Sequence, residues 1–226
     1  IHEDIQPLDW LFFPQQRLLT ISKGQLFHDA LNISMIKQKL AYYPDDIWFY
    51  LMACEWNKIS VEEAFVGRCG EVGDDTGSRL IAARIIQSIM NICFLQERKY
   101  APYSKWFGTA FKELKSAKEL ASILKSAMRA ENWKQREKNL TQAYVFIAKA
   151  HNALQITQPI EPSVSKYYGR KYTVIFASRF SEALFSGIQD AAIQRLNKIG
   201  SIDQATNTLT ILEDPKLIRK TAALYQ

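Results

Sequence analysis

The chain has 226 residues, of which 47% are hydrophobic and 23% are charged, and it carries a formal net charge of +6 at pH 7. This composition is typical of a folded globular protein and excludes a disordered or collagen-like chain. The richest apolar segment, RIIQSIMNICFL at residues 84–95, is interrupted by Arg84, Gln87, Ser88 and Asn91. A membrane-spanning helix needs about 20 apolar residues in a row, so we expect none here.

The N-terminal region contains the first predicted element. In RLLTISKGQLFHD, at residues 17–29, two short apolar stretches flank Lys23 and Gly24. This spacing is typical of two strands joined by a tight turn. We therefore predict a small β-hairpin within residues 1–31. The sequence begins at Ile1 rather than methionine, and we expect a further segment to precede it in the gene.

The rest of the chain, residues 32–226, shows mostly helical hydrophobic periodicity. The segment YYPDDIWFYLMACEW predicts a helix from Pro44 past Trp56, because proline and acidic side chains favour the first turn of a helix. Ser60 and Glu63 have the spacing of a capping box, which predicts that a second, short helix begins there.

The strongest helical pattern is GDDTGSRLIAARIIQSIMNICFLQERK, which is apolar on most of its circumference. It predicts a central buried helix over about residues 75–99. Further helices are expected at Ser104–Leu114, Ala117–Met128 and Trp133–Asn152, within YTVIFASRFSEALFSGI, and at Pro215 with Asp214 as its cap. The predicted fold is a mainly α, single-domain helical bundle around the central helix, with the small β-hairpin near the N-terminus.

Charge is distributed unevenly along the chain. Residues 1–75 contain six Lys and Arg against twelve Asp and Glu, whereas residues 98–138 contain eleven against four. A basic region suits an anionic ligand, and an acidic region suits a partner protein or a metal ion. A charge run is also often a solvated helix face, so both interpretations stay open.

The usual catalytic motifs are absent from the sequence. No two acidic residues are two positions apart, so the alternating carboxylates that hold Mg²⁺ in nucleotidyltransferases are missing. His2, His28 and His151 lack metal-ligand spacing, and there is no Cys-x-x-Cys. We therefore expect no metal site, no cofactor and no catalysis by this chain alone.

The start of the predicted central helix carries a candidate ligand site. The segment VGRCGEVGDDTGSRLIAAR places Arg68, Glu71, Asp74, Ser78 and Arg84 around it. Backbone amides at a helix N-terminus attract anions, and arginines add charge-assisted hydrogen bonds. The alternative is ordinary capping, in which an aspartate caps the helix and the arginines pair with acids.

A polar stripe follows the predicted central helix. Arg84, Ser88, Asn91 and Arg98 fall within about 80° of one another at 100° per residue. On a mostly buried helix such a stripe is either a narrow solvent face or the polar lining of a cleft.

The segment RKYAPYSKWFGTAF, at residues 98–111, combines three cations with five aromatic rings. Such a surface could hold an anionic, planar ligand such as a nucleotide. Tyr103, Phe107 and Phe111 are spaced to form one aromatic row that packs inward. The better ligand candidates are then Tyr100, Lys105 and Trp106. Farther along, His151 and Asn152 close a helix, where they suit its C-terminal dipole and cap.

Several long stretches together resemble a bacterial family of domains of unknown function, found as the C-terminal helical domain of nucleotidyltransferase-like proteins. These stretches are LAYYPDDIWFYLMACEW, FVGRCGEVGDDTGSRLIAARIIQSIMNICFL, RKYAPYSKWFGTAF, HNALQIT and IGSIDQ. The resemblance implies a preceding N-terminal domain that supplies the catalytic carboxylates and uses Mg-nucleotide. By analogy, Glu71 or Asp74 could donate a carboxylate base. The family motif carries Arg68, Glu71, Asp74, Ser78, Arg84, Tyr103, Lys105, Trp106, His151 and Asn152 at these positions.

We therefore expect a helical domain that binds substrate or nucleotide and is not catalytic by itself. Two alternatives stay open: a scaffold that docks another protein through its acidic N-terminal half, and a nucleic-acid-binding module that uses the basic region 98–138. The cysteines Cys54, Cys69 and Cys93 are odd in number and lie in apolar surroundings, so we expect buried thiols in a cytoplasmic protein.

Overall fold

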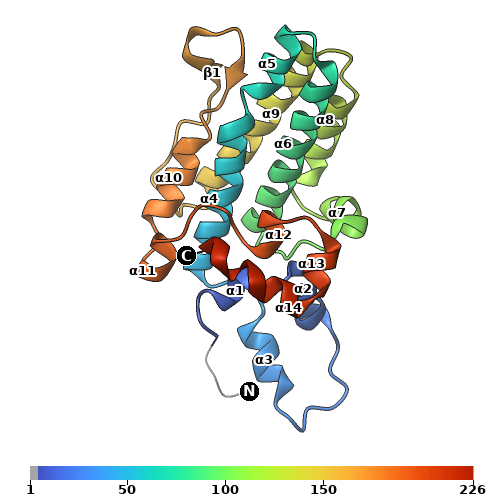
Figure 1. The fold of residues 1–226 in the computed structure, drawn as a ribbon, viewed down its shortest axis with the longest axis vertical. Coiled ribbons are helices and arrows are strands. Elements are labelled where there is room, and N and C mark those ends of the chain that lie inside the picture. The colour runs from blue at the N-terminus through green and yellow to red at the C-terminus, as the bar shows by residue number, and fades with distance from the viewer. Residues whose placement is uncertain (1–4, 226) are drawn as a thin grey trace.

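The structure is a computed structural model that describes residues 5–225, and it is mainly α-helical, as predicted (Figure 1). The first half contains α1 Asp9–Phe12, α2 Gln15–Lys23, α3 Ile33–Lys39, α4 Asp45–Glu62, α5 Phe65–Glu71, α6 Asp75–Gln96 and α7 Ser104–Phe111. The second half contains α8 Ala117–Arg129, α9 Trp133–Ala153, β1 Ser165–Lys166, β2 Thr173–Val174, α10 Ser178–Ser186, α11 Ala191–Gln194, α12 Ile202–Ala205, α13 Leu209–Glu213 and α14 Pro215–Lys220. Short 3₁₀ turns span Tyr167–Gly169 and Thr221–Tyr225.

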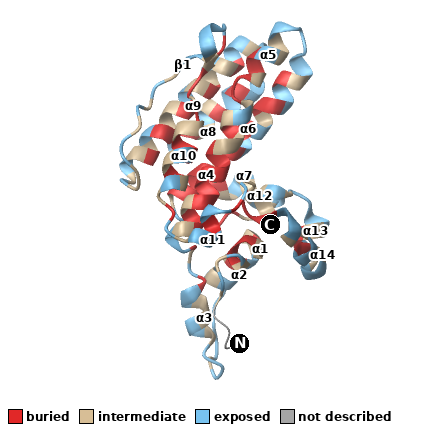
Figure 2. Cartoon of the chain, turned by 60° about the vertical axis from the view of Figure 1, so that its left-hand side comes forward, coloured by how far each residue is buried: buried red, intermediate tan, exposed pale blue. Residues whose placement is uncertain are grey.

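The longer helices form a bundle, and shorter helices gather at one of its ends (Figures 1 and 2). Within the bundle α4 packs against α6 and α10, and α9 packs against α6 and α8. At the end of the bundle the two terminal regions are joined. The backbone amide of Gln15 donates to the Asp203 carboxylate (2.9 Å), and Arg17 donates to the backbone carbonyl of Glu213 (2.7 Å). Helix α3 projects away from this end, and each of its residues is at least partly exposed.

Helix α6 is the central helix that the sequence predicts. Asp74 caps its N-terminus by accepting a hydrogen bond from a backbone amide of the first turn (2.7 Å). The isoleucines along its apolar side lie in the main core of the bundle. The helix ends at Gln96 rather than near residue 99, because Arg98 has a φ of 49°, which a right-handed helix cannot continue.

By length and composition α6 is apolar enough to cross a membrane, although the polar interruptions in its sequence predicted otherwise. In the bundle, 61% of its most apolar window is buried inside the protein. Packing against the neighbouring helices therefore accounts for most of this apolar surface.

The predicted N-terminal β-hairpin is wrong, because residues 15–23 form helix α2 instead. Leu18 lies in the core while Arg17 and Thr20 are exposed, so the apolar positions follow a helical period rather than strict alternation. Gly24 then donates its amide to the carbonyl of Thr20 (2.9 Å). This glycine marks the end of a helix and not a tight turn between strands.

A small hairpin does form near the C-terminus, where residues 165–166 pair antiparallel with residues 173–174. Gly169 in the connecting turn has a φ of 74°, a conformation that glycine adopts without strain. The sequence predicted a helix across the second strand. The β-branched pair Thr173 and Val174 favours the strand instead, and α10 begins only at Ser178.

The predicted capping box at Ser60 is also wrong. Ser60 lies inside α4, and its hydroxyl donates to the backbone carbonyl of Asn57 (2.7 Å). Ile59 is fully buried, so α4 continues through this position to keep its apolar face in the core. The next helix, α5, begins at Phe65.

Two helical glycines give a matched test of how tightly α5 packs against α9. A Cβ added to Gly70 would lie 2.1 Å from the ring of Trp133, whereas a Cβ added to Gly108 in α7 would meet no atom within 4 Å. We expect Gly70→Ala to lower the free energy of unfolding by about 2 kcal/mol, because the overpacked ring must move. Gly108→Ala should raise it by up to about 1 kcal/mol through helix propensity. Urea denaturation measures the free energy of unfolding of both variants. Equal changes in the two would contradict the close packing of Gly70 against Trp133.

Candidate functional site

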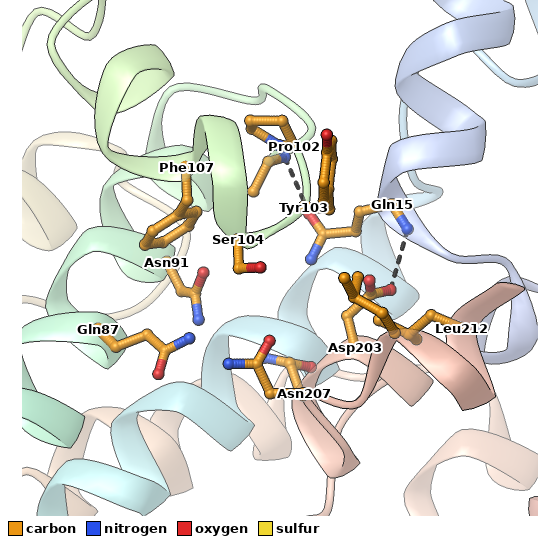
Figure 3. Close-up of a pocket in the computed structure, with 13 residues that line it drawn as sticks. Gln15, Gln87, Asn91, Pro102, Tyr103, Ser104, Phe107, Asp203, Asn207 and Leu212 are labelled. Atoms are coloured by element: carbon orange, nitrogen blue, oxygen red, sulfur yellow. Dashed lines mark hydrogen bonds between the residues drawn. The ribbon is translucent and has the colours of Figure 1, made fainter.

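A polar cleft lies where α6 and the end of α4 face α12 and the segment that follows it (Figure 3). Two adjoining cavities, of about 40 and 430 Å³, form this cleft and share five lining residues. The shared residues are Gln87, Asn91, Asp203, Gln204 and Asn207. Other polar residues that line it are Gln15, Asn57, Lys58, Glu62, Arg84, Ser88, Tyr103 and Ser104. The combined space is large enough for a small organic molecule.

Side-chain amides supply many of the hydrogen-bonding groups in the polar cleft. In Figure 3 the amides of Gln87, Asn91 and Asn207 point toward a common space, and Ser104 lies at its edge. Each amide offers two donors and one acceptor oxygen. The lining can therefore bind hydroxyl, amine and carbonyl groups without requiring a charged ligand.

A buried carboxylate, Glu55, lies beneath the polar cleft and is 0% exposed. Its Oε1 accepts hydrogen bonds from three lining side chains, Gln204 (2.8 Å), Asn91 (3.2 Å) and Lys58 (3.3 Å). Its Oε2 is buried and has no hydrogen-bond partner within residues 5–225. Because one buried carboxylate holds three side chains, it fixes the shape of this part of the cleft.

Asp203 is a carboxylate that lines both cavities of the polar cleft. One of its oxygens accepts the backbone amide of Gln15 (2.9 Å), which also ties α2 to the cleft. Burial raises the pKa of the Asp203 carboxyl to about 6. The group is therefore mainly ionised at neutral pH and above. No ion pair to this carboxylate is found in the part of the chain that the structure describes.

Both cations that line the polar cleft are already paired. Arg84 at the rim binds Glu62 through Nε (2.9 Å) and Nη2 (2.6 Å), and Lys58 binds Glu55 as well as the backbone carbonyl of Gln204 (2.8 Å). These pairs leave the charge of Asp203 uncompensated by a cation. The cleft therefore suits neutral or cationic ligands better than a polyphosphate.

The structure brings two of the residues singled out by sequence, Arg84 and Tyr103, into the polar cleft. Ser88 and Asn91 from the polar stripe on α6 join them, so this part of the stripe lines a cleft rather than only facing solvent. Arg98 does not line the cleft, because it follows the end of α6 in a left-handed conformation.

Four other candidates lie at the start of α6, at the opposite end of that helix from α7 (Figure 1). The guanidinium of Arg68 lies 5.3 Å from the Phe65 ring centre, and Glu71 accepts a hydrogen bond from the Tyr172 hydroxyl. Asp74 caps α6. The first and third contacts lie within α5 and α6, the second joins α5 to the residue before β2, and none of these side chains lines the polar cleft.

Ser78, the fourth of these candidates, is part of a buried network. Its hydroxyl donates to the backbone carbonyl of Val66 (2.9 Å) and accepts a hydrogen bond from Arg136 (2.6 Å). Arg136 is only 1% exposed, and it also binds Asp75 (2.9 Å) and the backbone carbonyl of Ala130 (3.3 Å). The network joins the start of α6 to α9 and to the end of α8.

Lys105 and Trp106 lie on the exposed side of α7, with the lysine ammonium 5.3 Å from the indole ring centre. Neither residue lines the polar cleft.

Asn152 near the end of α9 holds the following loop, because its amide both donates to and accepts from the backbone of Ile160 (2.7 and 3.0 Å).

His151 is fully buried next to Asn152, and its Nε2 lies 3.0 Å from the hydroxyl of Thr157. The rings of Trp56 and Phe180 meet it edge-on. Burial lowers the pKa of His151 to about 4, from 6.5. The imidazole is therefore neutral in the folded protein at physiological pH.

This burial predicts a pH-dependent loss of stability. In the unfolded chain His151 binds a proton as the pH falls through 6.5, whereas in the folded chain it binds one only near pH 4. Stability should thus decrease between these values, by up to about 3 kcal/mol. Urea denaturation at pH 7 and pH 4.5 should show a smaller decrease for His151→Gln, which does not titrate. An equal decrease in wild type and variant would contradict the assignment.

Sequence reasoning missed Glu55, Asp203 and the amides of Gln87 and Asn207. The segment IGSIDQ, which carries Asp203, was one of the stretches that resemble the family, so a signal was present. This signal did not identify the cleft, because α6 and the segment around Asp203 are far apart in the sequence and come together only in the folded chain. Among residues 5–225 no group of three His, Cys, Asp or Glu side chains could hold a metal ion.

The structure thus shows a mainly helical fold with a cleft lined largely by polar side chains. Residues 10–107 match the model of a family described as DUF4037, a domain of unknown function. This match runs from α1 into α7, so it includes Glu55, Gln87 and Asn91 but not Asp203. The comparison with curated proteins gives no match, and the comparison with solved structures gives none either.

Proposed function

We propose that this chain is the helical substrate-binding domain of a cytoplasmic, nucleotidyltransferase-like protein, and that the polar cleft holds the acceptor. The sequence resemblance motivates the pairing with a catalytic domain in the same protein, which would supply the metal-binding carboxylates and use Mg-nucleotide. The observation that carries the proposal is the convergence of amides on the polar cleft above the buried carboxylate Glu55.

The charges of the polar cleft favour the acceptor over the nucleotide as its ligand. The cations Lys58 and Arg84 are paired with Glu55 and Glu62, and within residues 5–225 no ion pair to Asp203 is found. Bringing the phosphates of a nucleotide into this environment would add like-charge repulsion. A neutral or cationic molecule that carries several hydroxyl or amine groups avoids this repulsion and can use the amides.

Ligand-induced stabilisation tests the proposal. A library of neutral and cationic polyhydroxylated compounds should contain members that raise the Tm of the protein, because a ligand that binds only the folded state stabilises it. Mg-ATP alone should not raise it through this cleft. Absence of any rise across the library would remove the acceptor assignment.

Two exposed glutamines on long helices provide a matched pair of variants. Gln87 on α6 lines both cavities of the polar cleft, whereas Gln142 on α9 lines neither of them. Loss of one hydrogen bond should weaken binding about fivefold in Gln87→Ala. Gln142→Ala should bind as the wild type does. Equal weakening in both variants would place the ligand elsewhere.

A further inference from the structure

A second cavity, of about 400 Å³, lies between α2, the C-terminal end of α6 and α7. We name it the aromatic pocket. It is lined by the rings of Tyr42, Phe94 and Tyr100 and by the cations Lys23, Arg98 and Lys99. It is separate from the polar cleft, although Pro102 borders both. Its volume falls in the range of small-molecule sites.

The wall of the aromatic pocket presents ring surfaces rather than polar groups. The hydroxyl of Tyr100 donates to the backbone carbonyl of Leu40 (3.2 Å), and that of Tyr42 approaches the carbonyl of Leu95 (3.5 Å). Both hydroxyls are thus directed to the backbone of the protein. The Tyr42 and Tyr100 rings lie 5.2 Å apart between centres. The two rings are therefore in contact with each other and form one continuous aromatic wall, against which a planar ring can pack.

The mouth of the aromatic pocket is basic. Lys23, Arg98 and Lys99 are exposed there, against one acidic residue, Glu113. Arg98 is held in place, because its guanidinium lies 3.8 Å from the Trp48 ring centre and pairs with an aspartate outside the pocket (2.7 Å). Lys99 pairs with Glu97 (3.5 Å), which does not line the pocket, and the side chains of Lys23 and Lys99 are both exposed at the mouth. This excess of positive charge complements an anion.

We propose that the aromatic pocket binds a small molecule that combines a planar ring with one anionic group. The ring packs against Tyr42, Phe94 and Tyr100, and the anionic group lies at the mouth beside Lys23 and Lys99. This site accounts for the cations and rings at the start of RKYAPYSKWFGTAF, whereas Lys105 and Trp106 later in that segment lie outside the pocket. The proposal does not depend on the function assigned to the polar cleft.

Matched probes separate the ring from the charge. We would titrate the protein with 2-naphthoate, with its neutral counterpart 2-naphthamide, and with AMP, which carries a phosphate on a planar purine. Naphthoate should bind about tenfold more tightly than naphthamide, because only the acid meets the basic mouth. Tighter binding of AMP would indicate a phosphate ligand, and tighter binding of naphthoate a carboxylate ligand. Equal affinities for naphthoate and naphthamide would overturn the proposal.

Exposed lysines provide the variants, since their replacement leaves the core intact. The double variant Lys23→Gln with Lys99→Gln should weaken naphthoate binding about fivefold and leave naphthamide unchanged. The control is Lys105→Gln, because Lys105 is an exposed lysine of the same segment that does not line the pocket. This variant should bind naphthoate as the wild type does. If Lys105→Gln weakens binding as much as the double variant, the charge effect is not local and the proposal fails.

Discussion

Replacing Arg136 with alanine is expected to lower the free energy of unfolding by about 3–5 kcal/mol, or to prevent stable folding. Arg136 is 1% exposed, and its guanidinium binds Ser78, Asp75 and the backbone carbonyl of Ala130. Its removal leaves these acceptors without their donor and opens a cavity between α6, α8 and α9. Urea denaturation followed by circular dichroism measures the loss.

The matched control for Arg136 is Arg79, because both arginines bind the carboxylate of Asp75. The Arg79 side chain is 42% exposed, and an exposed ion pair of this kind contributes at most about 1 kcal/mol. Arg79→Ala should therefore lower the free energy of unfolding far less than Arg136→Ala does. Similar losses in the two variants would show that burial of Arg136 does not determine the effect.

Replacing Glu55 with alanine is expected to lower the free energy of unfolding by about 3 kcal/mol. It should also disorder the side chains that line the polar cleft. The carboxylate accepts hydrogen bonds from Lys58, Asn91 and Gln204, and each donor loses a partner when it is removed. Because these donors line the cleft, ligands that raise the Tm of the wild type should no longer do so. Differential scanning fluorimetry with and without ligand measures both effects.

Glu62→Ala provides the comparison for Glu55. Glu62 lines the same cleft, but its partner Arg84 is at the rim with a side chain that is 57% exposed. The cost in stability should be at most about 1 kcal/mol. Ligand-induced stabilisation should largely persist in this variant. Loss of ligand response in Glu62→Ala with retention in Glu55→Ala would reverse the roles that we assign to the two carboxylates.

The helices with strong local signals could be predicted from the sequence. Pro44 and the acids after it begin α4, and Asp74 caps α6, because helix starts depend on residues within a single turn. The prediction of an N-terminal hairpin was wrong because α2 is short, and a short apolar run fits a strand and a helix equally well. Burial of Leu18 in the folded protein decides between them.

The polar cleft was predictable only in part. The stripe of Arg84, Ser88 and Asn91 on α6 indicated one wall, since residues on one helix face follow from the helical period. The opposite wall, with Asp203 and Asn207, comes from a distant part of the chain, and its position depends on tertiary packing. For the same reason Arg136, the buried partner of Ser78, gave no local signal.

The side-chain amides of the polar cleft offer the most direct test of the central claim. Their ¹H–¹⁵N signals can be followed while a library of polar fragments is added to the folded protein. We predict that the fragments that bind shift the amide signals of Gln87, Asn91, Gln204 and Asn207 together and leave that of Gln142 unchanged. Fragments that bind without moving the four cleft signals would contradict the claim that this cleft is the ligand site.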